Sequence, residues 1–308
     1  MKILVTGGAG FIGSHVVDAY IQSGHQVVVT DNLTTGKRSN LNPEAIFYPV
    51  DIRSRGEMET IFQNQLPDVV NHHAAQINLR HSVEDPGYDA EINILGSITL
   101  LELCRKHHVK KCIFASTGGA IYGEPDKIPV DERAPARPLS PYAIAKRSVE
   151  LYLEYYHRIW GLEGVVLRYG NVYGPRQDPR GEAGVIAIFC GNILRGASCR
   201  VFGNGHKTRD YVSVHDIARA NLMALTAPSD IYNLGTGLET SVNRLVQILQ
   251  DLTGQKIPVV HEEERRGEIE RIALSAEKAG RMLGWRPSIP LEKGMEEVIG
   301  WFREKEKS

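Results

Sequence analysis

The chain opens with Met1-Lys-Ile-Leu-Val-Thr-Gly-Gly-Ala-Gly-Phe-Ile-Gly-Ser-His15. In this stretch a short apolar run stops at a glycine cluster and resumes as a helical pattern, which predicts a strand, a tight turn and a helix start. Gly7, Gly10 and Gly13 stand three residues apart. A dinucleotide-binding fold needs such glycines for a tight turn, for close approach of the backbone to a pyrophosphate, and for packing of the helix on the strand.

The start of the predicted helix, at Phe11 and Ile12, suits a phosphate because free N–H groups and the helix dipole favour negative charge there. A second apolar strand, residues 26–30, ends at Asp31 and is followed by Asn32. An acid at this place can hydrogen-bond the ribose hydroxyls of adenosine. A glycine-rich turn can also be purely structural, but its position between a strand and a helix favours nucleotide binding.

Composition and charge exclude several classes of protein. The formal net charge of −1 provides no field that would recruit nucleic acid or an anionic membrane. No stretch approaches the ~20 apolar residues of a membrane span, and the apolar run after Lys2 is broken by glycine and lacks the cleavage site of a signal peptide. The four cysteines form no CxxC pair, which is typical of core residues in a reduced protein. We therefore expect a cytoplasmic protein without a metal or a disulfide.

Strand patterns alternate with helical patterns along the chain. The expected strands are residues 3–6, 27–30, 46–50, 69–72, 112–115 and 165–169. This alternation predicts an α/β fold, with a Rossmann-type doubly wound parallel sheet and a smaller C-terminal substrate-binding α/β domain. We expect the dinucleotide-binding domain to comprise residues 1–172, rejoined by about 207–238, and the substrate domain to comprise residues 173–206 and 239–308.

The ends of the third and fourth strands carry further candidate residues. Asp51 and Ile52 end the third strand, where the carboxylate could reach the adenine amino group or could instead cap the helix that follows. The fourth strand ends in adjacent histidines, His72 and His73. Adjacent residues of a strand point to opposite faces, so this pair cannot chelate one metal ion, and both are expected to be packing residues.

Small side chains follow the histidines at Ala74 and Ala75, where a cofactor could pass close to the backbone.

Two segments, residues 90–108 and 141–160, read as helices that are apolar nearly all round. Ser140 is the expected N-cap of the second helix, Pro141 takes its first position and Gly161 ends it. One sheet cannot cover every side of such helices. The second domain could bury them, but we favour a homodimer in which the two helices pair with their symmetry mates as a four-helix bundle.

Within the second helix, Tyr142 and Lys146 stand one turn apart on the same face. Upstream, Ser116 and Thr117 end a strand at the carboxyl edge of the predicted sheet, where open α/β sheets bind ligands. A hydroxyl, a phenol and an ammonium group together can transfer a proton. The nearby cation is expected to favour tyrosinate and to lower the phenol pKa, which is ordinarily ~10, toward the working pH.

At this point the chain resembles the UDP-glucose (UDP-galactose) 4-epimerase family of the extended short-chain dehydrogenases/reductases, over essentially its whole length. The motifs that carry the resemblance are Thr6-Gly-Gly-Ala-Gly-Phe-Ile-Gly13, Asp31-Asn32, Asp51-Ile52, His73-Ala-Ala75, Asn93, Ser116/Thr117, Tyr142-xxx-Lys146, Arg168-Tyr-Gly-Asn-Val-Tyr-Gly-Pro175 and Arg209-Asp-Tyr211. The resemblance implies bound NAD, with Asn93 and Tyr169 among the residues that hold it. Asp31 would repel the 2'-phosphate of NADP.

The activity that the resemblance implies is NAD-dependent 4-epimerisation of a UDP-hexose, UDP-glucose or UDP-galactose, through a transient 4-keto intermediate. Tyr142 would take the proton from the sugar 4-hydroxyl, and Lys146 would hold the nicotinamide ribose and tune Tyr142. Thr117 or Ser116 would hydrogen-bond the reacting oxygen. Since NAD is regenerated in every cycle, it would be retained rather than released.

The resemblance also implies a nucleotide-sugar site in the C-terminal part of the chain. Asn171, Arg209 and Arg265 match residues that bind the diphosphate, and Glu268 falls near the uridine ribose. Val185 opens an apolar helix in the same region. Arginine forks suit phosphate oxygens, although either arginine could be an ordinary surface charge.

Two departures from the family pattern leave choices open. Five positions separate Thr117 from Tyr122, where the best-studied family members have four, so Ser116 and Thr117 both remain candidates for the catalytic hydroxyl. Ile272 falls where family members control the room around the hexose C2 substituent. A mid-sized aliphatic side chain there is compatible with the glucose and the N-acetylglucosamine series.

Other activities of the same fold leave different marks in the sequence. Dehydratases and decarboxylases carry an acid beside the catalytic hydroxyl, and Gly118-Gly119-Ala120 supplies none. Asp178 would repel a uronate, but Arg180 keeps a UDP-glucuronate 4-epimerase as the runner-up. A non-catalytic dinucleotide-binding regulator would tend to lose the Tyr/Lys pair, and a dehydrogenase that releases NADH is a third alternative.

Overall fold

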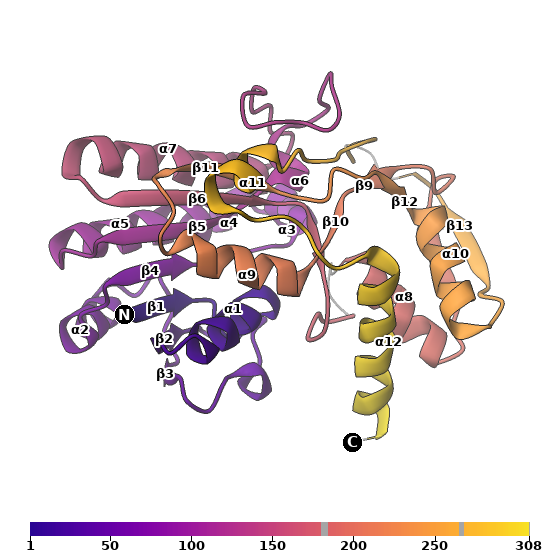
Figure 1. Cartoon of the computed structure of the whole chain (residues 1–308), viewed down its shortest axis with the longest axis horizontal. Helices are drawn as coiled ribbons and strands as arrows, with labels where there is room; N and C mark the ends of the chain where they lie inside the picture. Colours follow the sequence, from indigo (N-terminus) through magenta and orange to yellow (C-terminus); the bar gives the residue numbers. More distant parts are fainter. Residues whose placement is uncertain (180–183, 265–267, 308) are drawn as a thin grey trace.

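The computed structural model describes residues 1–179, 184–264 and 268–307. Within them, a seven-stranded parallel sheet forms the centre of the fold, in the order β11-β6-β5-β4-β1-β2-β3 (Figure 1). Its strands are β1 Lys2–Thr6, β2 Gln26–Thr30, β3 Ile46–Tyr48, β4 Val69–His72, β5 Lys111–Thr117, β6 Glu163–Tyr169 and β11 Asp230–Leu234. The predicted parallel α/β sheet is confirmed, and every expected strand forms.

Helices cover both faces of this sheet, which explains why its strands are nearly continuous runs of valine, isoleucine and leucine. One face packs against α1 Phe11–Gln22, α9 Val214–Ala224 and α11 Glu277–Leu283, and the other against α2 Arg55–Gln65, α5 Ser97–Lys106 and α7 Pro141–Trp160. Each face contributes its own apolar core.

The strand order reverses beside the glycine turn, and a ligand-binding crevice is expected at such a place in an open α/β sheet. β1 pairs with β2 on one side and with β4 on the other, so Thr6 lies between Thr30 and His72. The chain runs outward from β1 through β2 to β3 and then crosses back to β4. Ligands of open α/β sheets bind at the carboxyl ends of the strands where the order reverses in this way.

Helix α7 has the ends that its sequence predicts. The side chain of Ser140 accepts a hydrogen bond from the N–H of Ala143 at 3.3 Å, and Pro141 occupies the first turn. Gly161 ends the helix in the left-handed conformation, with φ of 71°. These local signals set the ends of the helix, and its regular turns place Tyr142 and Lys146, four residues apart, on one face.

The helix expected at residues 90–108 differs in detail from the prediction. It begins earlier, as α4 Pro86–Ala90, passes through a π-helical turn at Glu91–Gly96, and ends as α5 at Lys106. Asp85 starts it by accepting a hydrogen bond from the N–H of Tyr88 at 2.9 Å. A π-helical turn inserts an extra residue and is frequent at functional sites.

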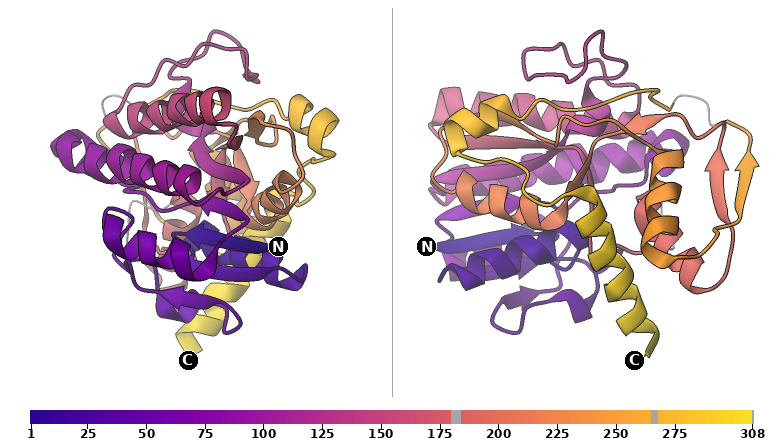
Figure 2. Two further views of the ribbon diagram at one scale, coloured as in Figure 1. Left: turned by 90° about the vertical axis from the view of Figure 1, so that its left-hand side faces the viewer. Right: turned by 45° about the vertical axis from the view of Figure 1, so that its right-hand side comes forward.

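A smaller lobe lies at the end of the molecule opposite the N-terminus, where α10 and the strand pair β8/β13 are seen (Figures 1 and 2). Its elements are α8 Val185–Leu194, α10 Val242–Thr253, α12 Leu291–Lys307, β8 Cys199–Phe202 and β13 Val259–Glu262. They share a third apolar core. Two short strand pairs connect the lobe to the sheet. They are β7 Asn171–Tyr173 with β10 Tyr211–Ser213, and β9 Thr208–Arg209 with β12 Thr240–Ser241.

The remaining elements are short: α3 Leu79–Glu84, α6 Gly118–Ile121 and a 3-10 turn at Arg38–Asn40. In residues 1–179, 184–264 and 268–307, no helix has the length and apolarity needed to cross a membrane.

Candidate active site

The glycine turn packs so tightly that side chains are excluded at two of its positions. Gly7 has a left-handed φ of 70°, and a Cβ built there would lie 2.6 Å from the amide nitrogen of Ala74. A Cβ on Gly13 would lie 2.3 Å from the carbonyl oxygen of Gly7. Helix α1 therefore sits directly against the turn, as a dinucleotide site requires.

The N-terminus of α1 is suited to an anion. Its N-cap is Gly10, in extended conformation, and in the described part of the chain no side chain caps it. The first turn, which contains Phe11 and Ile12, carries no acid. The backbone N–H groups and the helix dipole are thus directed toward the crevice without a competing negative charge.

Asp31 joins the glycine turn to the loop after β2. One of its carboxylate oxygens accepts a hydrogen bond from the N–H of Ala9 at 3.0 Å, and the other accepts one from the N–H of Leu33 at 2.8 Å. Burial raises the pKa of Asp31, and the two hydrogen bonds oppose this rise. The acid is held at the carboxyl end of β2, where the sequence predicted a ribose contact.

Asp51 is held by a neighbouring arginine. Arg53 donates from Nε at 3.0 Å and from Nη2 at 2.9 Å to its two oxygens, and Asn32 Nδ2 donates at 2.9 Å. The hydrogen bond from Arg53 lowers the pKa of Asp51 to about 2. The carboxylate binds the N–H of Arg53, while Ser54 is the N-cap of α2, so the alternative role as a helix cap is not observed. Ile52 beside it is buried.

The adjacent histidines point to opposite faces, as predicted. His72 is buried, with Nδ1 2.7 Å from Thr6 Oγ1 and Nε2 2.9 Å from Ser97 Oγ, so its packing role is confirmed. The His73 ring stacks on Tyr169, with 6.4 Å between centroids. Burial lowers the pKa of His73 to about 3.

Among the described residues, no three His, Cys, Asp or Glu side chains gather in a way that could hold a metal ion.

Asn93, on the π-helical turn, fixes the loop after β4. Its Nδ2 donates to the carbonyl oxygen of Gln76 and to Asp89 Oδ1, both at 2.9 Å, and its Oδ1 accepts from the N–H of Gln76 at 2.9 Å. The loop so held contains Ala74 and Ala75, which are half-buried. In this structure the amide of Asn93 therefore binds protein groups that border the crevice.

Tyr142 and Lys146 meet the end of β5. Lys146 Nζ donates to the carbonyl oxygen of Ala115 at 2.9 Å and lies 5.8 Å from the centre of the Tyr142 ring. Burial lowers the pKa of Lys146 to about 8, and the negative charges of Asp89 and Glu150 oppose this. The two acids thus compensate part of the cost of burying the positive charge of Lys146.

The expectation of a lowered phenol pKa is wrong. Burial, which is the larger cause, and the negative charge of Asp89 raise the pKa of Tyr142. The sequence shows the cation of Lys146 one turn away, but it shows neither the burial of the phenol, which disfavours a phenolate, nor the nearby acid Asp89.

Ser116 and Thr117 point to opposite faces of β5. Ser116 is buried and its hydroxyl donates to Glu150 Oε1 at 2.6 Å. Thr117 is half-buried at the last position of the strand, immediately before α6. The hydroxyl of Ser116 is therefore engaged in a buried cluster, whereas Thr117 stands at the edge that faces the crevice.

That buried cluster was missed by sequence reasoning. Arg168 donates from Nε to Glu150 Oε1 at 2.8 Å and from Nη2 to Glu150 Oε2 at 2.6 Å. Its Nη1 donates to the hydroxyl of Tyr122 at 2.7 Å, and that hydroxyl donates to Asn233 Oδ1 at 2.7 Å. The spacing of Glu150, four residues after Lys146 on the same face of α7, was the available signal.

Two of the candidate substrate residues lie on the short strands that connect the sheet to the smaller lobe, and a third lies in the lobe itself. Asn171 starts β7, and its Oδ1 is 3.1 Å from the position of a Cβ on Gly119, so it adjoins α6. Arg209 is on β9 and donates from Nη1 to the carbonyl oxygen of Thr208 at 2.9 Å. Val185 starts α8 and packs on the core of the lobe.

Four other positions singled out in the sequence have different outcomes. Glu268 is described and half-buried. Arg265, and Arg180 on which the uronate alternative depends, lie outside the described residues. Ile272 is buried in a small apolar cluster that includes Tyr122.

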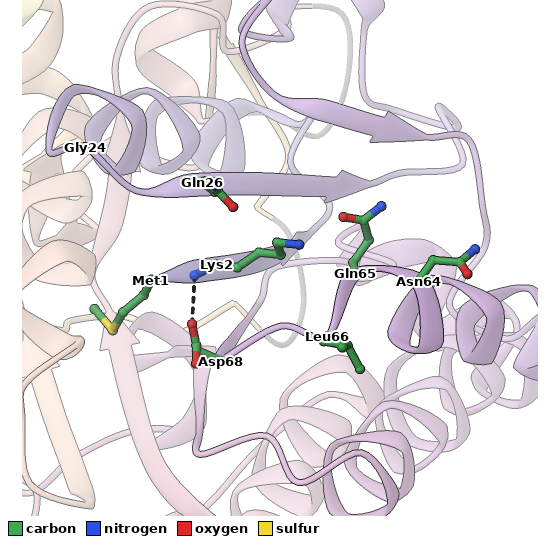
Figure 3. Close-up of a pocket in the computed structure, with 8 residues that line it drawn as sticks. All are labelled: Met1, Lys2, Gly24, Gln26, Asn64, Gln65, Leu66 and Asp68. Atoms are coloured by element: carbon green, nitrogen blue, oxygen red, sulfur yellow. Dashed lines mark hydrogen bonds between the residues drawn. The ribbon is translucent and has the colours of Figure 1, made fainter.

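A surface hollow of about 480 Å³ lies at the opposite edge of the sheet (Figure 3). Met1, Lys2 and Gln26 line it at the amino ends of β1 and β2, and the backbone N–H of Lys2 donates to Asp68 there at 2.9 Å. Because parallel α/β sheets bind ligands at their carboxyl ends, this hollow is not the expected ligand site.

Comparison with known proteins gives a consistent result over the full length. Residues 3–235 match the model of the NAD dependent epimerase/dehydratase family. The UDP-glucose 4-epimerase of Mycolicibacterium smegmatis is 38% identical over 312 residues, covering 99% of both chains.

Two solved structures are also similar. The UDP-glucose 4-epimerase of Thermotoga maritima with UDP-glucose has a TM-score of 0.97 at 50% identity and 99% coverage of both chains. The Thermus thermophilus UDP-glucose 4-epimerase complex with NAD has a TM-score of 0.95 at 45% identity, covering 98% of this chain and 99% of that one.

Proposed function

The chain belongs to the NAD-dependent epimerase/dehydratase family, and from this premise we propose that it interconverts UDP-glucose and UDP-galactose by epimerisation at C4. The observation that carries the proposal is the position of Tyr142 and Lys146 against the end of β5, at the sheet edge that also bears the glycine turn. The reaction is an isomerisation that passes through a transient 4-keto sugar.

NAD is the cofactor, and the residues of this chain fit it. The glycine turn leaves no room for side chains at Gly7 and Gly13, and α1 begins without an acid or a cap in the described residues. Asp31 stands where a 2'-phosphate would meet its negative charge. Bound NAD supplies the oxidation and the return reduction at sugar C4. We assign its adenosine end to Asp31, Asn32 and Asp51 and its nicotinamide end to the neighbourhood of Lys146.

The protein's part in the chemistry is proton transfer. Tyr142 takes the proton of the sugar 4-hydroxyl as the carbonyl forms and returns it when the hydroxyl is restored. Lys146 places a positive charge near the phenol ring, at 5.8 Å from its centre. We assign the hydroxyl that binds the reacting oxygen to Thr117, because Ser116 donates to the buried Glu150. Burial and the negative charge of Asp89 both favour the protonated phenol.

Residues from both proposed domains are assigned to the nucleotide sugar. We propose that residues 1–172 and about 207–238 bind NAD, and that residues 173–206 and 239–308 bind the nucleotide sugar. Asn171 and Arg209 suit the diphosphate, and Arg265 is their expected partner outside the described residues. Glu268 is assigned to the uridine ribose and Val185 to the wall of the same site.

The surroundings of Thr117 disfavour dehydratase chemistry. A side chain at Gly118 would begin with a Cβ 2.3 Å from Leu274 Cδ1, and one at Gly119 would begin 3.1 Å from Asn171 Oδ1. The acid that dehydratases carry beside the hydroxyl is thus replaced by glycine here, and a side chain at either position would require Leu274 or Asn171 to move. The site is built for a single proton transfer at the 4-hydroxyl.

The assignment is tested by incubating the protein with UDP-galactose, UDP-N-acetylglucosamine and UDP-glucuronate in turn, with no added cofactor, and following the sugar by NMR. We expect UDP-galactose to be converted to UDP-glucose without accumulation of NADH. Preferential turnover of UDP-N-acetylglucosamine or UDP-glucuronate would mean that the substrate is misassigned. Steady formation of NADH, or no turnover of any of the three, would contradict the proposal.

We also propose that the chain is a homodimer. In the single chain, a row of large apolar side chains is exposed on α7 and on the π-helical turn, and the smaller lobe does not cover it. The row consists of Leu95, Ile144, Leu151, Tyr152, Tyr155, Ile159 and Trp160. Exposed apolar patches of this kind mark protein–protein contacts. Pairing of α5 and α7 with their symmetry mates would bury it as a four-helix bundle.

Introducing a charge in this row is expected to separate the subunits. Leu151 is 50% exposed in the single chain, so Leu151→Glu places a carboxylate in the proposed interface with little effect on the fold. Sedimentation at micromolar concentration should give the mass of two chains for the wild type and of one chain for Leu151→Glu. Met282→Glu, at an equally exposed residue of α11, is the matched control and should stay a dimer. A wild-type mass of one chain would contradict the proposal.

A cytoplasmic location is proposed as well. The four cysteines are buried free thiols, as expected in a reducing compartment.

A further inference from the structure

Asp210 is a buried acid between two of the short strands that connect the sheet to the smaller lobe. It follows Arg209, the last residue of β9, and precedes Tyr211, the first residue of β10. Its exposed fraction is 1%, and the proposed function gives it no role. Burial of a carboxylate is costly unless hydrogen bonds replace those to water, so the partners of Asp210 indicate what the acid does.

The carboxylate of Asp210 binds two segments that are far from it in the sequence. Its Oδ1 accepts hydrogen bonds from the backbone N–H and the hydroxyl of Thr236, at 2.8 and 2.6 Å. Its Oδ2 accepts from the N–H of Gly237 at 3.0 Å and from the N–H of Leu274 at 2.9 Å. Both oxygens face donors, which is the arrangement of an ionised carboxylate. Asp210 therefore ties the junction of β9 and β10 to the loop after β11 and to residue 274.

Two glycines leave room for Asp210. A Cβ on Gly235 would lie 2.4 Å from Asp210 Oδ2, and a Cβ on Gly170 would lie 2.9 Å from the carbonyl oxygen of Asp210. The same carbonyl oxygen accepts a hydrogen bond from the N–H of Asn171 at 2.7 Å. Asp210 is thus bonded directly to one residue assigned to the diphosphate, Asn171, and is the chain neighbour of the other, Arg209.

Arg209 lies on a strand pair that is too short to hold it in place alone. β9 and β12 share two residue pairs, Arg209 with Thr240 and Thr208 with Ser241, beside the smaller lobe (Figure 1). An isolated pair of strands is marginally stable in water, so a fixed position for Arg209 needs support from outside the pair. The hydrogen bonds of the next residue, Asp210, provide that support.

We propose that Asp210 is a positioning residue, whose carboxylate holds β9 so that Arg209 presents its guanidinium group to the diphosphate of the nucleotide sugar. The inference rests on the proposed function for the role of Arg209. An arginine fork binds phosphate oxygens only in a defined geometry, so a displaced strand loses affinity. Loss of the carboxylate then weakens the binding of UDP itself, and it leaves bound NAD and the proton transfer of Tyr142 in place.

Titration of the NAD-loaded protein with UDP, followed by calorimetry, tests this role without turnover. We expect Asp210→Asn to raise the Kd of UDP by about 10-fold, the equivalent of one hydrogen bond to a charged group. Arg209→Met should raise it by at least as much. Because the acid acts through the arginine, adding Asp210→Asn to Arg209→Met should change the Kd by less than about 2-fold. An unchanged Kd in either single variant, or effects that multiply in the double variant, would overturn the proposal.

Asp216→Asn is the matched control for a general loss of stability. Asp216 is also a fully buried acid, on α9, and it accepts hydrogen bonds from the N–H groups of Ser288 and Ile289 at 2.9 and 3.1 Å. Both Asp→Asn variants should lower the melting temperature, but Asp216→Asn should bind UDP like the wild type. An equal loss of UDP affinity in the two variants would show a merely structural role for Asp210 and would overturn the proposal.

A second pair of variants decides the matter if Asp210→Asn does not fold. Thr236→Val removes the hydroxyl that donates to Asp210 Oδ1, and Thr236→Ser keeps it. Thr236→Val should raise the Kd of UDP about 3-fold, the equivalent of a single hydrogen bond, and Thr236→Ser should leave it unchanged. Equal affinities in these two variants would contradict the proposal.

Turnover separates this inference from the proposed function. The KM for UDP-galactose should rise in Asp210→Asn, while kcat stays within a few-fold of the wild type and NAD stays bound. If the wild type bound UDP with the expected pattern of variants but converted no UDP-sugar, the proposed function would fail and the role of Asp210 would stand. Conversion of UDP-galactose without that pattern would overturn the role of Asp210 alone, and a wild type that bound no UDP would overturn both.

Discussion

Replacement of Tyr142 by phenylalanine is expected to reduce kcat by about 10²- to 10⁴-fold, the range typical of a lost general acid–base group. The phenol oxygen is the group assigned to the proton of the sugar 4-hydroxyl, and phenylalanine keeps the ring while removing that oxygen. The initial rate of UDP-galactose conversion at saturating substrate is the measurement. The Tyr142 hydroxyl is assigned no structural role, so the fold should persist.

Two controls distinguish a catalytic loss from a structural one. Tyr142→Phe should retain NAD and a wild-type melting temperature, because the glycine turn and the ends of α7 are unchanged. Tyr152→Phe removes a phenol oxygen from a position of the same helix that is exposed in the single chain and has no assigned role in the chemistry, so it should keep the wild-type rate. A Tyr142→Phe rate within a few-fold of the wild type would mean that the base is misassigned.

The second large effect is expected on stability. Arg168→Met leaves the buried carboxylate of Glu150 without its bidentate partner, at contacts of 2.8 and 2.6 Å in the intact protein. Breaking a buried ion pair by removing one partner costs about 3–5 kcal/mol, because the remaining charge stays desolvated. Urea unfolding monitored by far-UV circular dichroism should show a loss of this size in the free energy of unfolding.

The double variant Glu150→Gln with Arg168→Met is the control for this interpretation. It removes both charges, so it should be more stable than Arg168→Met alone. A single variant within about 1 kcal/mol of the wild type, the size of an exposed pair, would contradict a buried role for this ion pair.

Much of the fold could be predicted because its signals are local. The glycine spacing and the β-branched runs predicted the sheet, and the Ser140-Pro141 start with the Gly161 stop predicted α7. The interruption at Glu91–Gly96 could not be predicted, because the apolar pattern is the same for a helix with or without a π-helical turn. Packing of Asn93 against the loop after β4 accompanies it.

The sequence provides candidate site residues, which stay predictions, but it does not provide their electrostatic surroundings. The motifs in the sequence predicted Tyr142, Lys146 and the hydroxyls at the end of β5. Which of the two hydroxyls faces α7 depends on how β5 packs against that helix, and the sequence does not show this. Asp89 and Glu150 come from helix positions whose proximity to Lys146 is set by tertiary packing. For that reason the predicted direction of the Tyr142 pKa was wrong.

The most direct test of a redox-neutral reaction at C4 is the fate of the hydrogen on that carbon. UDP-galactose carrying deuterium at C4 should be converted, without added NAD, to UDP-glucose that retains the deuterium at C4. Replacement of the deuterium by solvent hydrogen, or oxidation of the sugar with release of NADH, would contradict the account.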